Sequence, residues 1–382
     1  MADHGVNAGM SAEDADGLAH MLEPVLRDHC GGRLGPIEWF RSQWQRGGAA
    51  TGFSLWSFEN GGCVPVLVKL PVGPVEYRWT SRLGKVDDAS WAEGAGLPVP
   101  RVVACGTEVG GYDLAWVVVE RLSGSPLGRN GSHLVEQDVR DMLEAVVEFQ
   151  SRAVAAHPVD AKAARSVKEP DWEALIERGR EGARDHVIAD APRWSEALRQ
   201  VGRALPGLLN TWHARPINAW CHGDVHPGNA MRRTKESGSP MLPGGENGFA
   251  IGGGAPLGST VAEREGELAG EGGCVLIDMA LVHPGHWLED ALYLERQFWG
   301  HEQYLHGIKP VSELARLRRE RGMSGSGSGG GAAEDGDYAH LACVRRVLAA
   351  ACAPALIERE GNPKYIHAAL EVVEKFLPMA AR

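Results

Sequence analysis

The chain has 382 residues, and 43% of them are hydrophobic, which is enough to bury one large core or two lobes. Its formal net charge of −11 and the lack of a stripe of Lys and Arg argue against nucleic acid as a partner, while a cationic substrate stays possible. Seven scattered cysteines without a CxxC pair favour a reduced compartment. The acidic N-terminus lacks an apolar signal core and no run is long enough to span a membrane, so we expect a cytoplasmic protein without a membrane partner.

The first third of the chain predicts a helical extension over residues 1–30 followed by several strands. Strand-like runs cover residues 37–44, 52–59 and 64–70, and the last of these, VPVLVKL, is short, apolar and rich in β-branched residues. Lys69 lies inside this run. A buried Lys costs desolvation free energy unless it is paired, so Lys69 either binds a negative group or reaches solvent from an edge strand.

A glycine-containing turn, WQRGGAATGF, separates the first two strand-like runs. Gly47 and Gly48 would let the main chain approach an anion and present N–H groups to it, although the segment could equally be a plain hairpin. After the third run, GPVEYRWTSRLG carries Glu76, and residues 114–122, LAWVVVERL, then predict a buried strand that ends in a polar turn.

The rest of the chain is mainly helical in pattern. Apolar residues recur at helical intervals, and this predicts helices over residues 133–156, 195–213, 287–299, 338–357 and 363–377. Residues 234–273 and 322–336 are rich in Gly, Ser or Pro and predict flexible insertions. Such insertions are tolerated because the entropic cost of closing a loop grows only logarithmically with its length.

Two motifs carry the chemistry. In CHGDVHPGNAM, Asp224 and Asn229 lie five residues apart on a predicted tight loop, and in VLIDMALVHPGHWLEDAL, Asp278 ends a short apolar run. In kinase-type phosphoryl transfer an Asp orients the attacking hydroxyl, while an Asn and a second Asp hold Mg²⁺ against the nucleotide phosphates. The motifs therefore indicate phosphoryl transfer.

Together these motifs resemble the aminoglycoside phosphotransferase and choline kinase-like family, a phosphotransferase family whose fold is similar to that of protein kinases. The resemblance implies an α+β, bilobal protein kinase-like fold. A small β-rich N-terminal lobe is expected over residues 31–122, and a larger, mainly helical C-terminal lobe over residues 123–382.

The resemblance also implies a role for each matching residue. Asp224 would be the catalytic base, and Asn229 and Asp278 would be the Mg²⁺ ligands. Lys69 would hold the phosphates of ATP or GTP, with Glu76 or Glu93 as its ion-pair partner. The nucleotide site would be completed by residues that contribute main-chain groups: Gly47 and Gly48 over the phosphates, and Glu120 to Leu122 at the base.

The predicted activity is the Mg²⁺-assisted transfer of a γ-phosphoryl group to a hydroxyl of a small molecule. The sequence leaves open the acceptor, the choice between ATP and GTP, and the oligomeric state. A catalytically silent nucleotide-binding module is one alternative, and a metal-dependent hydrolase with His222, Asp224 and His226 as ligands is another. Under the kinase interpretation His222 holds the loop by packing and hydrogen bonding, and Asp290 braces it.

Overall fold

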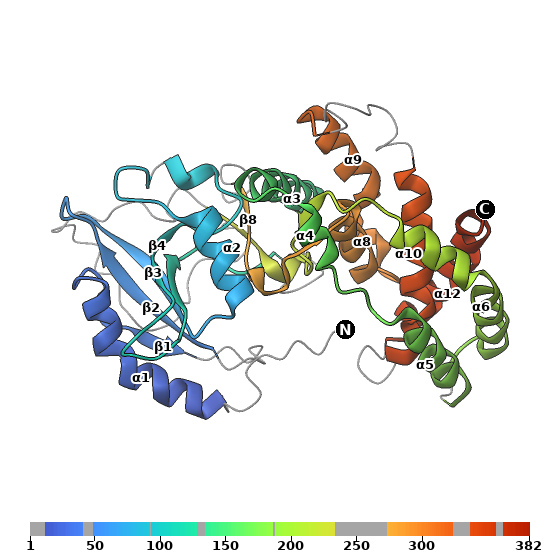
Figure 1. Cartoon of the computed structure of the whole chain (residues 1–382), viewed down its shortest axis with the longest axis horizontal. Helices are drawn as coiled ribbons and strands as arrows, with labels where there is room; N and C mark the ends of the chain where they lie inside the picture. Colours follow the sequence, from blue (N-terminus) through green and yellow to red (C-terminus); the bar gives the residue numbers. More distant parts are fainter. Residues whose placement is uncertain are drawn as a thin grey trace, which may run out of the picture. The chain divides into compact units, whose positions relative to one another are not determined.

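The computed structural model describes residues 12–40, 49–91, 93–127, 134–185, 188–233, 273–323, 337–356 and 362–382. These residues belong to two compact units. The sheet unit consists of residues 4–129 and 227–281, and the helical unit consists of residues 130–226 and 282–382, each as far as it is described (Figure 1). One unit is rich in β-structure and the other in helices, which confirms the predicted α+β class.

The sheet unit contains a five-stranded antiparallel sheet with the strand order β1-β2-β3-β5-β4. The strands are β1 (Glu38–Phe40), β2 (Ala50–Ser57), β3 (Cys63–Leu70), β4 (Val102–Gly106) and β5 (Trp116–Glu120). Burial alternates strictly along β3, as the two-residue period of a strand requires. Lys69 therefore points to the face opposite Val68 and Leu70, and it lies on a central strand rather than at an edge.

One face of the sheet packs against helix α1 (Ala12–His29), which lies along the sheet in Figure 1. Ala19, Leu22 and Leu26 of this helix are buried in one core with the inward-facing valines of β3. Helix α2 (Pro74–Gly84) follows β3 and contributes Tyr77 to a smaller apolar cluster with residues of β4 and β5. The helix that carries Glu76 is thus anchored to the sheet.

A second two-stranded element, β7 (Ala230–Arg232) with β8 (Cys274–Leu276), also belongs to the sheet unit. The 3₁₀ turns Pro227–Asn229 and Met279–Leu281 flank it. Leu276 donates a main-chain hydrogen bond to Pro98 O, and Arg233 donates to Val99 O and to the Glu120 carboxylate. The β7–β8 hairpin therefore packs with the sheet, although it follows the predicted lobe boundary at residue 122 in the sequence.

The helical unit contains a short strand pair, β6 (Ala219–Cys221) with β9 (His283–Gly285), surrounded by helices. The helices are α3 (Glu136–Ala156), α4 (Ala161–Arg165), α5 (Trp172–Asp185), α6 (Ala191–His213), α8 (Leu288–Gln297), α9 (Pro310–Glu320), α10 (Tyr338–Ala351) and α12 (Pro363–Ala380). Short 3₁₀ helices cover Glu93–Gly96 in the sheet unit and Glu302–Leu305 and Ala353–Leu356 in the helical unit.

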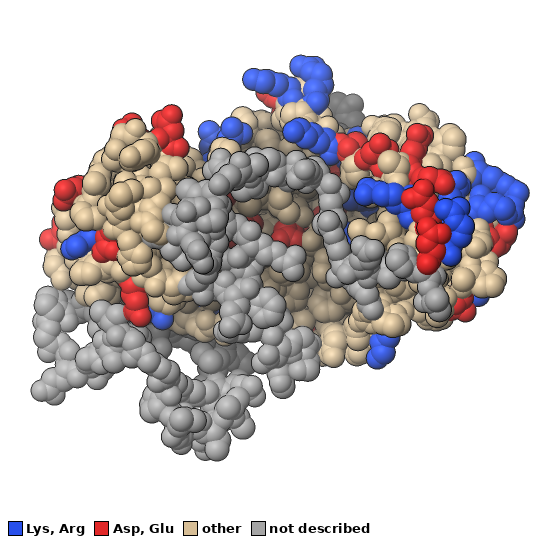
Figure 2. Space-filling view, turned by 90° about the horizontal axis from the view of Figure 1, so that it is seen from below, with Lys and Arg blue, Asp and Glu red and all other residues tan. Residues whose placement is uncertain are grey.

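The surface of the helical unit is mixed in charge. At the right-hand end of the view in Figure 2, acidic and basic side chains lie next to one another. The exposed ion pairs of this unit include Arg193 with Glu374 and Arg180 with Glu177. Exposed pairs of this kind contribute little stability.

All five helices predicted in the C-terminal two thirds are present with shifted ends, whereas α4, α5 and α9 were not predicted. The predicted flexible insertions lie outside the described residues, apart from Gly273, Gly322 and Met323. No described helix combines the length and the apolar composition needed to cross a membrane.

Candidate active site

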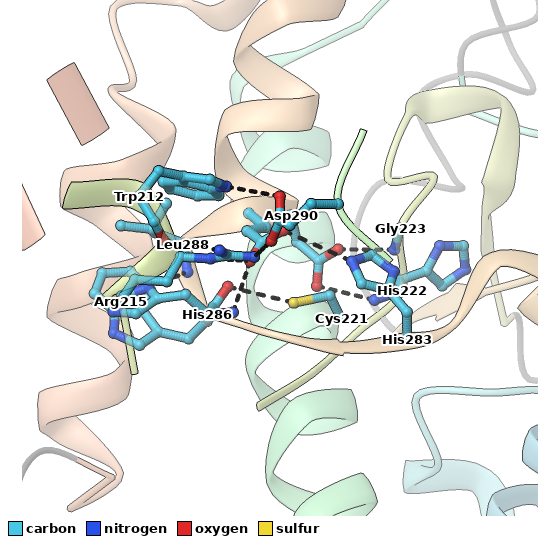
Figure 3. Close-up of polar contacts among 12 residues, drawn as sticks. Trp212, Arg215, Cys221, His222, Gly223, His283, His286, Leu288 and Asp290 are labelled. Carbon is cyan, nitrogen blue, oxygen red and sulfur yellow. Dashed lines mark hydrogen bonds and ion pairs between the residues drawn. The ribbon is translucent and has the colours of Figure 1, made fainter. Parts of the chain in front are cut away.

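The loop that follows β6 is braced by a buried carboxylate. Asp290, on α8, is 1% exposed and accepts hydrogen bonds from the main-chain N–H groups of His222 (3.1 Å) and Gly223 (3.0 Å) (Figure 3). Gln150, on α3, donates a third bond to Asp290 at 3.0 Å. Gly223 has a φ of 82°, a conformation that glycine adopts without strain. Asp290 therefore fixes the path of the loop, which confirms the bracing role expected from the sequence.

His222 stabilises the same loop from inside. Its side chain is fully buried, and its Nδ1 accepts a hydrogen bond of 3.3 Å from the main-chain N–H of Asp224. The ring meets Phe149 edge to face, with 6.0 Å between centroids. These contacts confirm that His222 holds the loop by packing and hydrogen bonding.

Asp224 is held through both of its carboxylate oxygens. Tyr293, on α8, donates its hydroxyl to Oδ1 at 2.5 Å, and Nε2 of His226 lies 3.6 Å from Oδ2. Burial alone would raise the pKa of Asp224, but the hydrogen bonds from His226 and Tyr293 and the nearby positive charge outweigh it and lower the pKa. Asp224 is therefore ionised at neutral pH and able to accept a proton.

A second ionic cluster supports the segment between β9 and α8. Glu289 Oε1 accepts from the main-chain N–H of His286 (2.8 Å) and from Arg215 Nε (3.0 Å) (Figure 3). Arg215 also binds Glu169 at 2.5 Å and stacks on Trp212, 4.0 Å from the ring centroid. Although burial of Glu289 raises its pKa, hydrogen bonding to His283 and the charge of Arg215 lower the pKa far below its usual range. The cluster ties α8 to the region before β6.

In the sheet unit, Lys69 forms the ion pair that a nucleotide-binding lysine requires. Its Nζ lies 2.5 Å from Glu76 Oε1 on α2, so the structure pairs Lys69 with Glu76, one of the two glutamates that the sequence left open. Desolvation of Lys69 lowers its pKa, but the negative charges of Glu76 and Asp278 raise it more, and the net pKa lies above the ordinary value. Lys69 thus stays positively charged, and the negative charge of Asp278 contributes to its raised pKa.

Asn229 and Asp278 are brought together by the β7–β8 hairpin. The main-chain N–H of Ile277 donates to Asn229 O at 2.9 Å, next to the first pair of the hairpin ladder, Ala230 with Leu276. Asp278 follows directly, with a φ of 64°, in the left-handed region that Asp tolerates better than most residues. An amide oxygen and a carboxylate oxygen are hard ligands of the kind that Mg²⁺ prefers, so the donor chemistry of this pair fits the metal.

The described residues contain no group of three or more His, Cys, Asp or Glu side chains arranged to hold a metal ion. His222, one of the ligands in the hydrolase alternative, already accepts the Asp224 N–H through its Nδ1. Its observed contacts are those of a loop-supporting residue.

At the predicted base-binding segment, Glu120 has a structural role. Its carboxylate is fully buried and accepts from Arg101 Nε (2.7 Å) and Arg233 Nε (3.0 Å). The N–H of Glu120 donates to Arg101 O, and the N–H of Arg121 donates to Pro65 O. Among the described residues no hydrogen bond to the N–H of Leu122 is found, so this group is the candidate donor to a base.

The structure distributes the predicted site residues over both units. Lys69, Glu76, Asn229 and Asp278 belong to the sheet unit, and Asp224 belongs to the helical unit. Gly47 and Gly48 lie outside the described residues.

Sequence reasoning missed Tyr293. A signal existed, because Tyr293 lies three residues after Asp290 in a predicted helix and so shares its face.

Comparisons with known proteins find a family that part of the chain is similar to. Residues 87–240 match the model of the phosphotransferase enzyme family. None of the curated proteins compared with the chain matches it.

Three solved structures illustrate the similarity. APH(2")-IIia, in complex with GDP and kanamycin, is 13% identical over 94% of this chain and 99% of that chain (TM-score 0.44). An aminoglycoside-3'-phosphotransferase of type VIII is 20% identical over 81% and 95% (TM-score 0.35). A choline kinase from Cryptosporidium parvum is 9% identical over 97% and 95% (TM-score 0.36).

The family match includes both Asp224 and Asn229. It confirms the resemblance that the motifs predicted.

Proposed function

We propose that the protein is a Mg²⁺-dependent kinase that transfers the γ-phosphoryl group of ATP or GTP to a hydroxyl of a small molecule. The observation that carries this proposal is that the candidate metal ligands and the paired lysine belong to one unit, the sheet unit. The β7–β8 hairpin brings Asn229 and Asp278 to one end, and the charge of Asp278 acts on Lys69, which is paired with Glu76. A lysine and two oxygen ligands in one unit suit a metal–nucleotide complex.

In the proposed reaction the hydroxyl oxygen of the acceptor forms a bond to the γ-phosphorus. The bond between that phosphorus and the bridging oxygen breaks, and a nucleoside diphosphate leaves. Asp224 accepts the hydroxyl proton, because its lowered pKa keeps it ionised. Tyr293 holds Oδ1, and Nε2 of His226 lies 3.6 Å from Oδ2.

The side-chain oxygens of Asn229 and Asp278 would hold Mg²⁺. When bound, the ion neutralises charge on the phosphates. Lys69 would bind the phosphates with Glu76 fixing its position, and Gly47 and Gly48 would cover them.

The main-chain N–H of Leu122 would donate a hydrogen bond to the nucleobase. In the Glu120–Leu122 segment it is the main-chain donor that has no hydrogen-bond acceptor among the described residues. Main-chain recognition of this kind leaves the choice between ATP and GTP to the surroundings of the base.

The test is Mg²⁺-dependent release of ADP or GDP in the presence of pooled acceptors: aminoglycosides, amino-alcohols, sugars and nucleosides. Asp224→Asn is compared with the wild type, and Asp28→Asn, which changes an exposed carboxylate on α1, is the matched control. We expect one pool to stimulate the wild type and the control but not Asp224→Asn.

Stimulation of all three proteins would contradict the role of Asp224. Tight Mg²⁺–nucleotide binding without turnover in any pool would instead favour the catalytically silent module.

A further inference from the structure

The sheet unit contains a cavity that the proposed reaction does not use. It has a volume of about 720 Å³, within the range of small-molecule sites. Its walls come from the segment Pro71–Pro74, one face of α2, the end of β4 and the residues that lead into β5. Helix α2 lies beside β4 in Figure 1. All of its lining residues belong to the sheet unit.

The rim of this cavity is positively charged. Arg78 and Arg82, four residues apart on one face of α2, and Lys85, directly after the end of the helix, are exposed and line it. Within the described part of the chain, none of these three side chains has a hydrogen-bond or ion-pair partner. Asp113 is the one acidic residue in the lining, so the rim carries an excess of positive charge.

The floor of the cavity is largely apolar. Val72, Leu114 and Ala115 contribute aliphatic surface. The Tyr77 hydroxyl and the Cys105 thiol, 4.0 Å apart, add a weakly polar patch. A ligand with an apolar body and one anionic group would bury the body on this floor and place the charge at the rim.

We propose that this cavity, the α2 pocket, binds a small carboxylate with an aromatic or aliphatic body, and that binding changes the affinity of the protein for its nucleotide. The guanidinium groups of Arg78 and Arg82 match a carboxylate in shape and charge, since each can donate two parallel hydrogen bonds. The positive rim selects against cations, and the apolar floor selects against small inorganic anions.

The effect on the nucleotide rests on the proposed function, whereas the binding itself does not. Helix α2 carries Glu76 on the side that faces Lys69, and the α2 pocket uses another face of the same helix. A bound ligand would tie α2 to Pro71–Pro74 and to the start of β5, and so restrict the motion of Glu76 relative to Lys69. Since a ligand that orders one site lowers the cost of ordering the other, we expect tighter nucleotide binding.

The experiment measures binding by isothermal titration calorimetry with two probes of nearly equal shape, 1-naphthylacetate and its neutral amide. Arg78→Gln/Arg82→Gln removes two rim charges. Lys309→Gln/Arg319→Gln removes the same charge elsewhere, at exposed positions of the helical unit whose side chains have no hydrogen-bond or ion-pair partner among the described residues. We expect the acid to bind the wild type and the control equally, and the rim variant about tenfold or more weakly.

The amide is expected to bind the wild type about tenfold or more weakly than the acid. Equal binding of acid and amide, unchanged binding by the rim variant, or no saturable binding of the acid would each overturn the site. If the acid binds but leaves the dissociation constant of Mg²⁺–ATP and Mg²⁺–GTP unchanged, the coupling to the nucleotide is overturned and the site stands. If neither nucleotide binds at all, the proposed function fails independently of the probe result.

Discussion

Asp224 illustrates how neighbouring side chains set the protonation of a single residue. Its partial burial favours the neutral acid, but Tyr293 and His226 both stabilise the charged form, and the second effect is larger. Because the folded-state pKa of Asp224 is below its ordinary value, the carboxylate is available as a base at any pH above that range. The supporting tyrosine is thus a positioning residue for the proposed base.

Replacing Tyr293 by Phe removes the hydrogen bond to Asp224 Oδ1 and changes the volume of the side chain only slightly. We expect the pKa of Asp224 to rise, so the acid limb of the kcat/KM profile moves to higher pH, and kcat to fall about threefold to tenfold at neutral pH. Tyr365→Phe, which removes a hydroxyl that accepts from Arg296 in the same unit, is the control. An unchanged pH profile would exclude the positioning role.

Asp278→Ala should act on binding, whereas Asp224→Asn should act on transfer. Loss of Asp278 removes an oxygen ligand and a charge near Lys69, so we expect Mg²⁺-dependent nucleotide binding to weaken by about tenfold or more. Asp224→Asn should keep that affinity and lower kcat by about 10²-fold to 10⁴-fold. Equilibrium dialysis with and without Mg²⁺, beside single-turnover rates, separates the two effects. Equal nucleotide affinity of Asp278→Ala and the wild type would contradict the metal assignment.

At the scale of elements, helix α8 supports the loop after β6 through two of its residues and the region before β6 through a third. Asp290 binds the main chain of the loop and Tyr293 binds Asp224, whereas Glu289 binds Arg215. Asp290 and Tyr293 are three residues apart and so share one face of the helix, and the neighbouring Glu289 points to another side. The position of the proposed base therefore depends on how firmly α8 is packed.

Asp290→Ala should destabilise the helical unit. It leaves two main-chain N–H groups and the amide of Gln150 without their buried acceptor, for which we expect a loss of about 3 kcal/mol or more in the free energy of unfolding. Asp290→Asn keeps one acceptor oxygen and should lose less. Urea unfolding monitored by tryptophan fluorescence measures both variants, and a wild-type midpoint for Asp290→Ala would show that the brace is dispensable.

The segment before α8 also makes stability depend on pH. Burial, opposed by the charge of Glu289, lowers the pKa of His286 to about 4 from 6.5. Between those values the unfolded state binds a proton that the folded state does not, so stability falls as pH decreases, by about 1.4 kcal/mol per pH unit from this group. Denaturant unfolding at pH 6.5 and pH 5.5 should differ by about 1 kcal/mol, because the unfolded-state imidazole is only half protonated at the higher pH, and His286→Gln should remove this difference. A slope that persists in full in His286→Gln would assign it to other groups.

For the whole molecule, the two sequence motifs predicted the fold class and the site better than the spacing of apolar residues did. The sequence predicted the α+β class, the strand with Lys69, five helices and the loop brace, because each depends on local pattern or on a motif with a fixed geometry. Residues 227–233 and 273–281 pack with the sheet through Arg233 and Leu276, contacts between segments far apart in the chain that no local pattern encodes. Arg215 was missed for the same reason, since it acts through Glu169 and Glu289, which only the fold brings near. Tyr293 differs, because its three-residue spacing from Asp290 in a predicted helix was a local signal.

Deleting residues 236–271 should leave both units folded. The main-chain N–H of Arg233 donates to Gly273 O at 3.1 Å, so the two ends of the deleted stretch are already adjacent, and a shorter connection lowers the entropic cost of closing the loop. We expect a melting temperature equal to that of the full chain or slightly higher. A fall of several degrees in differential scanning calorimetry would mean that the deleted residues contribute packing.

The buried Glu120 carboxylate joins the end of β5, the Arg101 segment and Arg233 of the β7–β8 hairpin into one ionic cluster. Leu122, the proposed contact to the nucleobase, follows Glu120 by two residues. Arg233 directly follows β7, and the β7–β8 hairpin presents Asn229 and Asp278. Two ligands that bind to one connected element influence each other through a shared coupling free energy, and the coupling is reciprocal. Any change that a nucleoside makes in the affinity for Mg²⁺ should therefore be matched by an equal change that Mg²⁺ makes in the affinity for the nucleoside, even when no phosphate bridges them.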